Sequence, residues 1–226
     1  DGKGQVPCQT IEDVYAGFET LAEKECVLEQ RIDLDKEISV VLARSQTGTI
    51  INFPVAENAH VNGILHTTTV PTSVSAEQSQ KAIQIANDIA KGLGYVGTMA
   101  VEFFVSQDGE IIANEIAPRP HNSGHYTLDA CSSSQFEQQV RMLCGLPAGD
   151  CDLISPVVMV NLLGDVWGHS QPHWETLLSE TNIKLHLYGK QEARPGRKMG
   201  HFNVLAETVE QAMQQAETCF ENLKAD

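Results

Sequence analysis

Several features that mark common classes of protein are missing from this sequence. Its six cysteines form no CxxC pair and no zinc-like spacing, so neither a zinc-binding nor a redox cysteine motif is expected. No apolar run approaches the roughly 18 residues that a membrane-spanning helix needs. Basic residues are scarce, because 15 Lys and Arg stand against 30 Asp and Glu, giving a formal net charge of −15. Nucleic-acid binders usually carry a basic stripe, so we expect neither a nucleic-acid nor a membrane partner.

The rest of the composition is that of an ordinary globular protein. Hydrophobic residues make up 42% and charged residues 20% of the 226 residues, which is enough to bury a sizeable core. Scattered cysteines of this kind are typical of reduced thiols, which predicts a cytoplasmic protein. The chain begins with Asp1 and opens directly on a glycine-rich loop. A loop of that kind with nothing before it predicts a fragment of a longer protein.

Periodicity and capping signals predict an α+β fold with a mostly antiparallel sheet and packed helices. Capping patterns at Thr10, Ser75, Ser134 and Thr208 each start an expected helix. Strands are expected at 26–32, 37–44, 49–55, 157–163, 181–189 and 198–205. A change of character near residues 147–152 divides the chain into residues 1–150 and a smaller β-rich unit at 151–226.

A predicted β-hairpin is the centre of the sequence. Two runs of alternating apolar residues, Ala100–Ser106 and Glu110–Ile116, flank Asp108-Gly109. Asp-Gly favours a two-residue type I′ turn, because both central residues need a positive φ. With that loop, Gln107 pairs with Glu110.

This register places Glu102 directly opposite Glu115 on one face of the hairpin. Opposed carboxylates on neighbouring strands have Cβ atoms about 4.5–5.5 Å apart and repel each other. A shared proton, a basic side chain or a hard divalent cation such as Mg²⁺ or Mn²⁺ would offset the repulsion. Solvation of both side chains is the alternative. Phe104 and Ile111, which we expect on the same face, disfavour full solvation.

Two polar clusters lie downstream of the hairpin strands. The first follows the second strand directly, where Arg119, His121 and Asn122 add a guanidinium, an imidazole and an amide. The second lies around Pro195-Gly196, where four of the fifteen Lys and Arg fall within nine residues. This second cluster is either an exposed basic turn or a site for an anion such as phosphate.

Longer motifs resemble one known family. NEIAPRPHNSGH at 114–125, followed by SQFEQ at 134–138, is similar to the 5-(carboxyamino)imidazole ribonucleotide synthases, which are ATP-grasp ligases. ENAHVNGIL at 57–65, GYVGTMAVEFF at 94–104 and RPGRKMGHFN at 194–203 resemble the same family. The resemblance runs from Asp1 to about Leu205. It implies a partial ATP-grasp domain at 1–150, followed by a small C-terminal domain at 151–226.

The resemblance implies a carbon–nitrogen ligase of de novo purine synthesis. Such enzymes take 5-aminoimidazole ribonucleotide, bicarbonate and MgATP. Bicarbonate attacks the γ-phosphate to give carboxyphosphate, and the final products are the carboxyamino ribonucleotide, ADP and phosphate. The family also implies a homodimer whose product passes to a mutase.

Five residues near the hairpin match the reaction centre of the family. Glu102 and Glu115 match the two carboxylates that bind Mg²⁺, which agrees with the register derived above. Arg119, His121 and Asn122 are expected around the carboxyphosphate, where hydrogen-bond donors meet developing negative charge.

Other matching residues are expected to bind the two nucleotides. Lys190 and Arg197 match residues that hold the phosphate of the ribonucleotide. In the family, a mobile glycine-rich loop covers the ATP phosphates, a hinge strand holds adenine through its backbone, and a carboxylate binds the ribose. The residues expected to bind ATP in these ways are Asp1, Gly2, Lys3, Gly4, Gln5, Glu29, Gln30, Arg31, Ile32, Glu37, His60, Asn114 and Glu115.

The chain departs from the family in three places. Arg31 stands in the hinge where many relatives have Gly. Ala117 stands where most ATP-grasp enzymes have Asn, which argues against biotin carboxylase. The N-terminal domain of the family is missing, so we expect this chain alone to be inactive or nearly so.

Two alternatives to the carboxyamino-forming ligase stay open. The first is another purine-pathway ATP-grasp ligase, such as the formate-dependent transformylase. The second belongs to a different class, a nucleotide-binding module or fragment without turnover.

Overall fold

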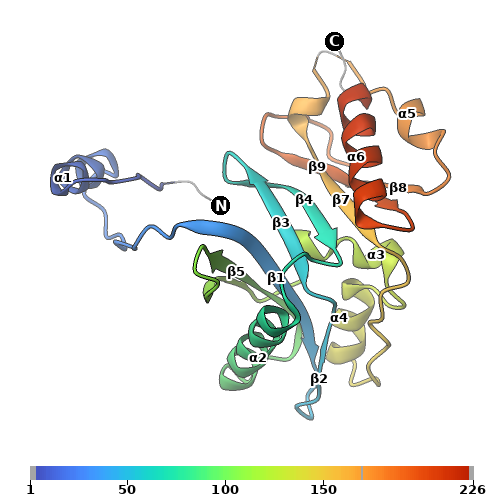
Figure 1. Cartoon of the computed structure of the whole chain (residues 1–226), viewed down its shortest axis with the longest axis horizontal. Helices are drawn as coiled ribbons and strands as arrows, with labels where there is room; N and C mark the ends of the chain where they lie inside the picture. Colours follow the sequence, from blue (N-terminus) through green and yellow to red (C-terminus); the bar gives the residue numbers. More distant parts are fainter. Residues whose placement is uncertain (1–3, 169, 224–226) are drawn as a thin grey trace.

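The computed structural model describes residues 4–168 and 170–223, and in this part of the chain nine strands form one sheet (Figure 1). The strand order is β6-β5-β1-β3-β4-β7-β9-β8, with β2 paired to β1 alone. All of these pairings are antiparallel, as predicted. The strands are β1 (Leu34–Arg44), β2 (Ile50–Asn52), β3 (Ala56–Val61), β4 (Ile64–Val70), β5 (Gly97–Ser106), β6 (Ile111–Ala117), β7 (Val157–Leu163), β8 (Ile183–Leu187) and β9 (Lys198–Leu205).

The helices begin close to the predicted capping signals. At α1 and α2, Thr10 and Ser75 form complete capping boxes with Asp13 and Gln78. The α-helices are α1 (Ile11–Thr20), α2 (Ala76–Gly92), α3 (Thr127–Ala130), α4 (Gln135–Leu143), α5 (Glu175–Leu178) and α6 (Val209–Leu223). Two 3-10 turns, η1 (Asn122–Gly124) and η2 (Gly164–Val166), complete the described elements.

Both faces of the sheet are covered by packed side chains. On one face, Ala82, Ala86 and Ala90 of α2 pack against β1, β5 and β6. Farther along the sheet, α6 covers β7 and β9 in a second cluster. A third cluster, which includes the buried Tyr126, joins β1, β4 and β7 to α3. Burial of apolar surface on both faces therefore fixes the strands that carry the predicted hairpin.

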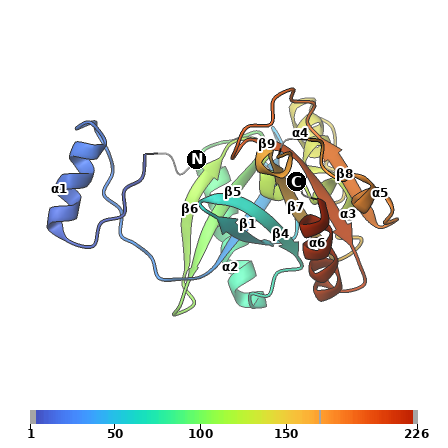
Figure 2. The same cartoon turned by 90° about the horizontal axis from the view of Figure 1, so that it is seen from above.

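Residues 4–32, which we call the arm, stand apart from the sheet in two views (Figures 1 and 2). The predicted strand at 26–32 does not form, because residues 24–33 have no regular secondary structure. Val27 and Leu28 are 82% and 73% exposed. The apolar residues of this segment suit a strand, but among the described residues no neighbouring strand supplies backbone partners.

The sheet continues across the segment where the sequence predicts a domain boundary. β4 pairs with β7 from Thr67 opposite Val160 to Val70 opposite Val157. Residues 144–156 connect the two parts without a helix or a strand. The division into residues 1–150 and 151–226 stays a prediction, because strand pairing does not show whether either part folds alone. None of the described helices is long and apolar enough to cross a membrane.

Candidate active site

The β5–β6 hairpin closes with a loop that is one residue longer than predicted. Ser106 and Glu110 face each other, with the Ser106 amide donating to the Glu110 carbonyl at 3.0 Å. The Gly109 amide also donates to the Ser106 carbonyl at 2.8 Å, and Gly109 has φ +84°. The two-residue type I′ turn is therefore wrong. A three-residue loop that ends on a left-handed glycine forms instead.

A β-bulge at Asn114 restores the predicted pairing of the two carboxylates. Near the loop, Val105 pairs with Ile111, whereas the predicted register places it opposite Ile112. Asn114 is then left unpaired, and beyond it Glu102 stands opposite Glu115, as predicted. The expected position of Ile111 is wrong. It packs in the core under α2, on the opposite face from Glu102, because a one-residue shift moves a side chain to the other face.

Glu102 lies among polar and charged side chains. His121 approaches it, with 3.7 Å between His121 Nδ1 and Glu102 Oε1, and the two side chains are 11% and 17% exposed. Burial raises the pKa of Glu102, the nearby His60 lowers it, and the Glu115 carboxylate raises it further. The repulsion predicted between the two opposed carboxylates is therefore present in the fold.

Glu37 and His60 meet beside this pair. His60 Nδ1 lies 3.0 Å from Glu37 Oε2, and the two residues come from neighbouring strands β3 and β1. Burial lowers the pKa of His60, but the carboxylates of Glu37 and Glu102 outweigh it and leave the pKa raised. Both predicted nucleotide-binding residues thus belong to one electrostatic cluster with Glu102.

The turn from Arg119 to Asn122 is held by Gln135 of α4. Gln135 Oε1 accepts from the His121 amide at 2.9 Å, and Gln135 Nε2 donates to the His121 carbonyl at 2.7 Å. Burial and the charge of Arg119 lower the pKa of His121 to about 3, so its imidazole is neutral near pH 7. Asn122 is buried, and both polar atoms of its side chain lack a partner within the described residues. A buried amide of this kind needs another polar group, such as a water or a substrate.

Lys198 is a site residue that the sequence argument did not single out. It begins β9, and its ammonium interacts electrostatically with Glu102, Glu115 and Arg119. Lys198 keeps an exposed surface, but desolvation among these groups lowers its pKa, while the Glu102 carboxylate opposes that shift. Its position at the start of a strand next to the basic turn was the available signal.

Lys190 and Arg197 lie in the loop between β8 and β9. Lys190 Nζ donates to the Lys198 carbonyl and lies 5.6 Å from the centre of the Tyr188 ring. Arg197 donates to the Glu192 carbonyl at 2.9 Å. Asp165 anchors the loop, because its carboxylate accepts from the Gly196 amide at 2.7 Å. The structure therefore keeps both predicted phosphate-binding residues on one ordered turn.

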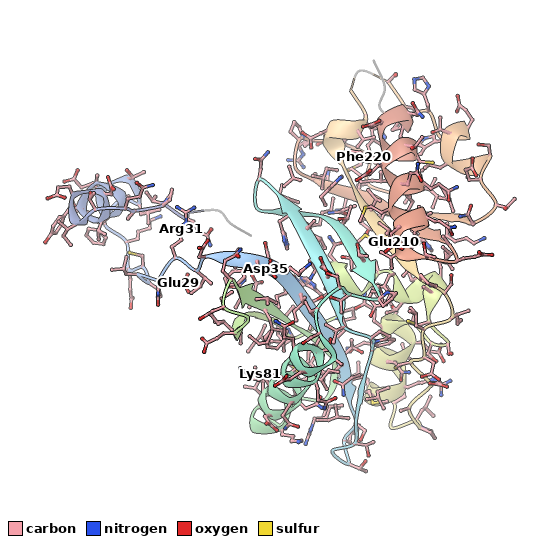
Figure 3. The ribbon with its side chains drawn as sticks, viewed as in Figure 1. Glu29, Arg31, Asp35, Lys81, Glu210 and Phe220 are labelled. Atoms are coloured by element: carbon pink, nitrogen blue, oxygen red, sulfur yellow. The ribbon has the colours of Figure 1, made fainter. Side chains whose placement is uncertain are left out.

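The predicted ATP-binding residues of the arm are not joined to this cluster. Asp1, Gly2 and Lys3 lie outside the described residues. Gly4, Gln5, Glu29, Gln30 and Arg31 are exposed, and Ile32 is partly buried. Figure 3 shows Glu29 and Arg31 on the arm, and Asp35 where β1 leaves it. Among the described residues, no hydrogen bond or ion pair links residues 4–32 to the sheet.

The arrangement of Glu102 and Glu115 suits Mg²⁺ held jointly by protein and substrate. It does not suit a metal ion held by protein ligands alone. Within residues 4–168 and 170–223, no group of three or more His, Cys, Asp or Glu is arranged to hold an ion. Mg²⁺ usually keeps waters and is bound by one or two carboxylates together with substrate phosphates. Two opposed carboxylates, one of them with a raised pKa, fit that donor set. Asn114, at the bulge, is exposed beside them.

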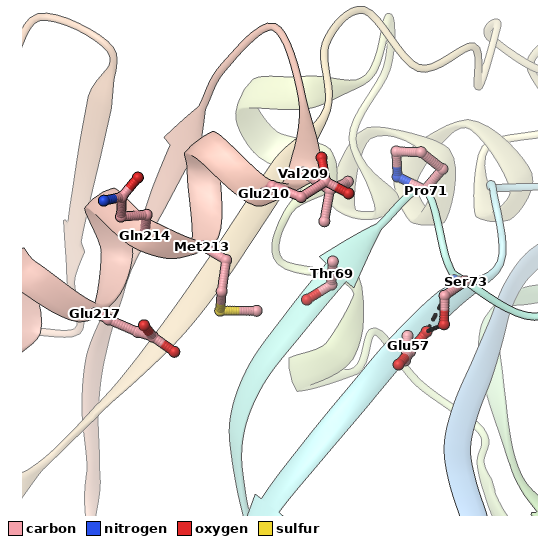
Figure 4. A pocket seen from close by; sticks show the side chains of 9 residues that line it. All are labelled: Glu57, Thr69, Pro71, Ser73, Val209, Glu210, Met213, Gln214 and Glu217. Atoms are coloured by element: carbon pink, nitrogen blue, oxygen red, sulfur yellow. Dashed lines mark hydrogen bonds between the residues drawn. The ribbon is translucent and has the colours of Figure 1, made fainter.

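A cavity lies on the other face of the sheet. It has a volume of about 440 Å³, and it is lined by α6 together with Glu57, Thr69, Pro71 and Ser73 (Figure 4). Glu57 pairs with Ile38, whose side chain is in the core under α2. The cavity therefore opens away from Glu102, and we do not assign it to the nucleotide.

The sequence matches two family models. Residues 1–136 match the ATP-grasp domain, and residues 157–215 match the phosphoribosylaminoimidazole carboxylase C-terminal domain. The chain is 45% identical over 215 residues to the N5-carboxyaminoimidazole ribonucleotide synthase of Bacillus subtilis, covering 95% of this chain and 56% of that protein.

Solved structures resemble the fold over nearly the whole chain. An ADP complex of an N5-carboxyaminoimidazole ribonucleotide synthetase has a TM-score of 0.87 at 49% identity, covering 97% of this chain and 57% of that one. The Aspergillus clavatus enzyme, in complex with ADP and 5-aminoimidazole ribonucleotide, has a TM-score of 0.84 at 30% identity, covering 94% and 57%. The chain thus spans a little over half the length of these relatives. It belongs to the N5-carboxyaminoimidazole ribonucleotide synthase family of ATP-grasp ligases.

Proposed function

We propose that this chain, as part of a protein with the full length of its relatives, catalyses the ATP-dependent carboxylation of 5-aminoimidazole ribonucleotide by bicarbonate. The observation that carries the proposal is the Glu102–Glu115 pair, which shares one sheet face with His60 and His121. Family membership adds the reaction class. Cytoplasmic location, a homodimer and transfer of the product to a mutase belong to the same proposal.

The reaction has two balanced steps. A bicarbonate oxygen attacks the γ-phosphorus of ATP, and the bond to ADP breaks to give carboxyphosphate. The exocyclic amine of the ribonucleotide then attacks the carboxyl carbon, phosphate leaves, and the nitrogen loses a proton. The product is the carboxyamino ribonucleotide. Most of the acceleration in phosphoryl transfer comes from positioning and electrostatic stabilisation.

Glu102 and Glu115 would hold Mg²⁺ against the ATP phosphates. When bound, the ion would neutralise charge that develops during phosphoryl transfer. Burial of Glu102 and the closeness of Glu115 disfavour two bare carboxylates, so this pair favours a cation. Neighbouring Glu37 would accept from the ribose hydroxyls, and His60 would keep Glu37 in place through their 3.0 Å contact.

The Arg119–Asn122 turn would bind the carboxyphosphate. Arg119 supplies positive charge, and the unpartnered Asn122 amide supplies a donor inside the site. His121 is neutral near pH 7, so it can accept or donate a hydrogen bond without adding charge. Lys190 and Arg197 would bind the phosphate of the ribonucleotide from the β8–β9 loop.

The arm would close over ATP. In this proposal Gly4 and Gln5, together with Asp1, Gly2 and Lys3, cover the phosphates, while the backbone of 29–32 holds adenine. The positive φ of Gly4, +80°, is compatible with close approach of the backbone to a phosphate.

The decisive experiment measures ADP release by the protein at the full length of its relatives. Release should require both bicarbonate and 5-aminoimidazole ribonucleotide. Dependence on formate instead would favour the transformylase. Binding of MgADP with no turnover under either condition would favour a nucleotide-binding module. The 226-residue chain alone should release little or no ADP.

A further inference from the structure

Three side chains connect the catalytic turn to the β8–β9 hairpin. Asp129, in α3, lies seven residues after Asn122 in the sequence. Its Oδ2 atom accepts from His186 Nε2 of β8 at 2.8 Å and from Asn203 Nδ2 of β9 at 2.6 Å. Asn203 Nδ2 also lies 3.3 Å from the His125 carbonyl. We call Asp129, His186 and Asn203 the Asp129 link.

Stacked imidazole rings reinforce the same connection. His186 lies on His201 with 4.6 Å between ring centres and an angle of 10° between the planes. His201 in turn lies on His125, at 4.7 Å and 28°. Burial lowers the pKa of His201 to about 2 and that of His125 to about 4, so neither ring carries a charge near pH 7. Tyr188 completes the set, because its hydroxyl lies 2.9 Å from His201 Nδ1.

The link sits between two groups that, in the proposed function, bind the two molecules that react with each other, carboxyphosphate and the ribonucleotide. One is the Arg119–Asn122 turn, where the carboxyl group is activated. The other is the β8–β9 loop with Lys190 and Arg197, where the ribonucleotide phosphate binds. His186 lies four residues before Lys190, and Asn203 lies six residues after Arg197. The loop that carries Lys190 and Arg197 is therefore flanked on both sides by strands that Asp129 contacts.

We propose that Asp129 is a positioning residue, which acts through His186 and Asn203 to set the β8–β9 loop relative to the Arg119–Asn122 turn. The proposal rests on the proposed function. Lys190 and Arg197 then bind the phosphate of the ribonucleotide while the exocyclic amine of the ribonucleotide lies beside the carboxyl group of carboxyphosphate. Holding the loop in advance lowers the entropy lost on binding and keeps the two reacting centres in range.

The contacts of the link do not resemble a simple core interaction. The side chains of His186 and Asp129 are 32% and 17% exposed, so neither fills a closed apolar cavity. The β8–β9 ladder is already complete over five backbone pairs, from Ile183 opposite Val204 to Leu187 opposite Gly200. Loss of the Asp129 contacts should leave this ladder formed and act mainly on the placement of the hairpin.

His186→Phe is the most informative variant. Phenylalanine keeps a flat ring on His201 but cannot donate to Asp129. In a protein with the full length of the relatives, KM for the ribonucleotide should rise roughly tenfold. Hydrogen bonds to charged groups contribute that factor or more to binding affinity. KM for ATP should stay within about twofold. His173→Phe is the matched control, because His173 is half exposed and lies outside the link.

Asp129→Ala tests whether the two residues act through one contact. The double variant Asp129→Ala/His186→Phe should raise KM for the ribonucleotide no more than Asp129→Ala alone, because the shared interaction is lost only once. Additive effects would overturn the proposal. So would equal rises in KM for ATP and for the ribonucleotide, since those indicate a general loss of structure.

Hydrogen exchange gives a readout that does not depend on turnover. Amides of residues 188–197 should exchange several-fold faster in His186→Phe and in Asp129→Ala, and at the wild-type rate in His173→Phe. Unchanged exchange of this loop in both variants would reject the positioning role. If the wild type shows no turnover with the ribonucleotide while loop exchange responds as expected, the proposed function fails and the mechanical role of Asp129 stands.

Discussion

The arm and the β5–β6 hairpin are assigned to the same nucleotide, but the fold supports them very differently. In the arm, Val27 and Leu28 are 82% and 73% exposed, whereas Phe103 and Val105 of β5 are 1% and 0% exposed. Strand β5 of the hairpin is paired along its length with β1, and the hairpin packs under α2. Few contacts oppose movement of the arm, while movement of the hairpin would break a core.

This difference separates two tasks. Charge stabilisation during phosphoryl transfer needs fixed groups, and Glu102 and Glu115 stand on fixed strands. Enclosing a nucleotide needs a part that can open for exchange, and the arm has the exposure that such a part requires. Rigid and adaptable parts of one site therefore come from two distant stretches of sequence that meet at β1, which follows the arm in the chain and pairs with β5.

The largest difference between the two regions should appear in stability. Phe103→Ala should lower the free energy of unfolding by about 3–5 kcal/mol, because it leaves a cavity under α2. Phe18→Ala should cost less than about 1 kcal/mol, because Phe18 lies on the arm and is 41% exposed. Urea unfolding of the two variants measures both values. Equal losses would show that the arm is packed as firmly as the hairpin.

The chemical role of the hairpin is tested by removing one charge. In a protein with the full length of the relatives, Glu115→Gln should slow ADP release roughly a hundredfold to a thousandfold. The reason is that a bound metal ion stabilises the transition state by several kcal/mol. Glu110→Gln is the matched control on the same hairpin and should keep normal activity. Circular dichroism should show the same fold for both. Near-normal turnover of Glu115→Gln would remove the carboxylate pair from the reaction.

The β8–β9 loop offers a third region for comparison. Arg197→Ala should raise KM for the ribonucleotide by roughly tenfold to a hundredfold, the contribution of hydrogen bonds from a charged group. Arg194→Ala should have a much smaller effect, since Arg194 contacts Glu192 on the exposed side of the loop. Steady-state kinetics with each substrate varied in turn gives both constants. An equal rise in KM for ATP would place Arg197 outside the ribonucleotide site.

The smallest effect is expected at the hinge of the arm. Arg31→Gly should change KM for ATP by less than about threefold, because the Arg31 side chain is exposed and adenine is expected to bind the backbone. The rate at saturating ATP should not change. A tenfold change in KM would show that the side chain itself contacts the nucleotide. Arg31→Ala separates that contact from the added backbone freedom of glycine.

Much of the sheet could be predicted because its signals are local. Local strand signals predicted β7 and β9 with their observed ends, and capping boxes located α1 and α2. The predicted strand at 26–32 did not form because a strand also needs a neighbouring strand to pair with, and the local sequence says nothing about that partner.

The site could be predicted only where its residues lie close together in the sequence and within one regular element. The opposition of Glu102 and Glu115 follows from one hairpin, although the predicted loop was wrong by one residue. The contribution of Lys198 depends on β9 being brought to β7, across a long connection. Asp129, His186 and Asn203 come from three elements, so no spacing in the sequence could bring them together.

The bulge at Asn114 has a consequence for how this hairpin can vary. A two-residue loop with no bulge and a three-residue loop with one bulge leave Glu102 opposite Glu115 in the same way. The register at the tip of the hairpin is therefore independent of the register at the end that carries Glu102 and Glu115. A change of one residue in loop length can be absorbed between Glu110 and Glu115, so the tip is free to diversify while the carboxylates stay in place.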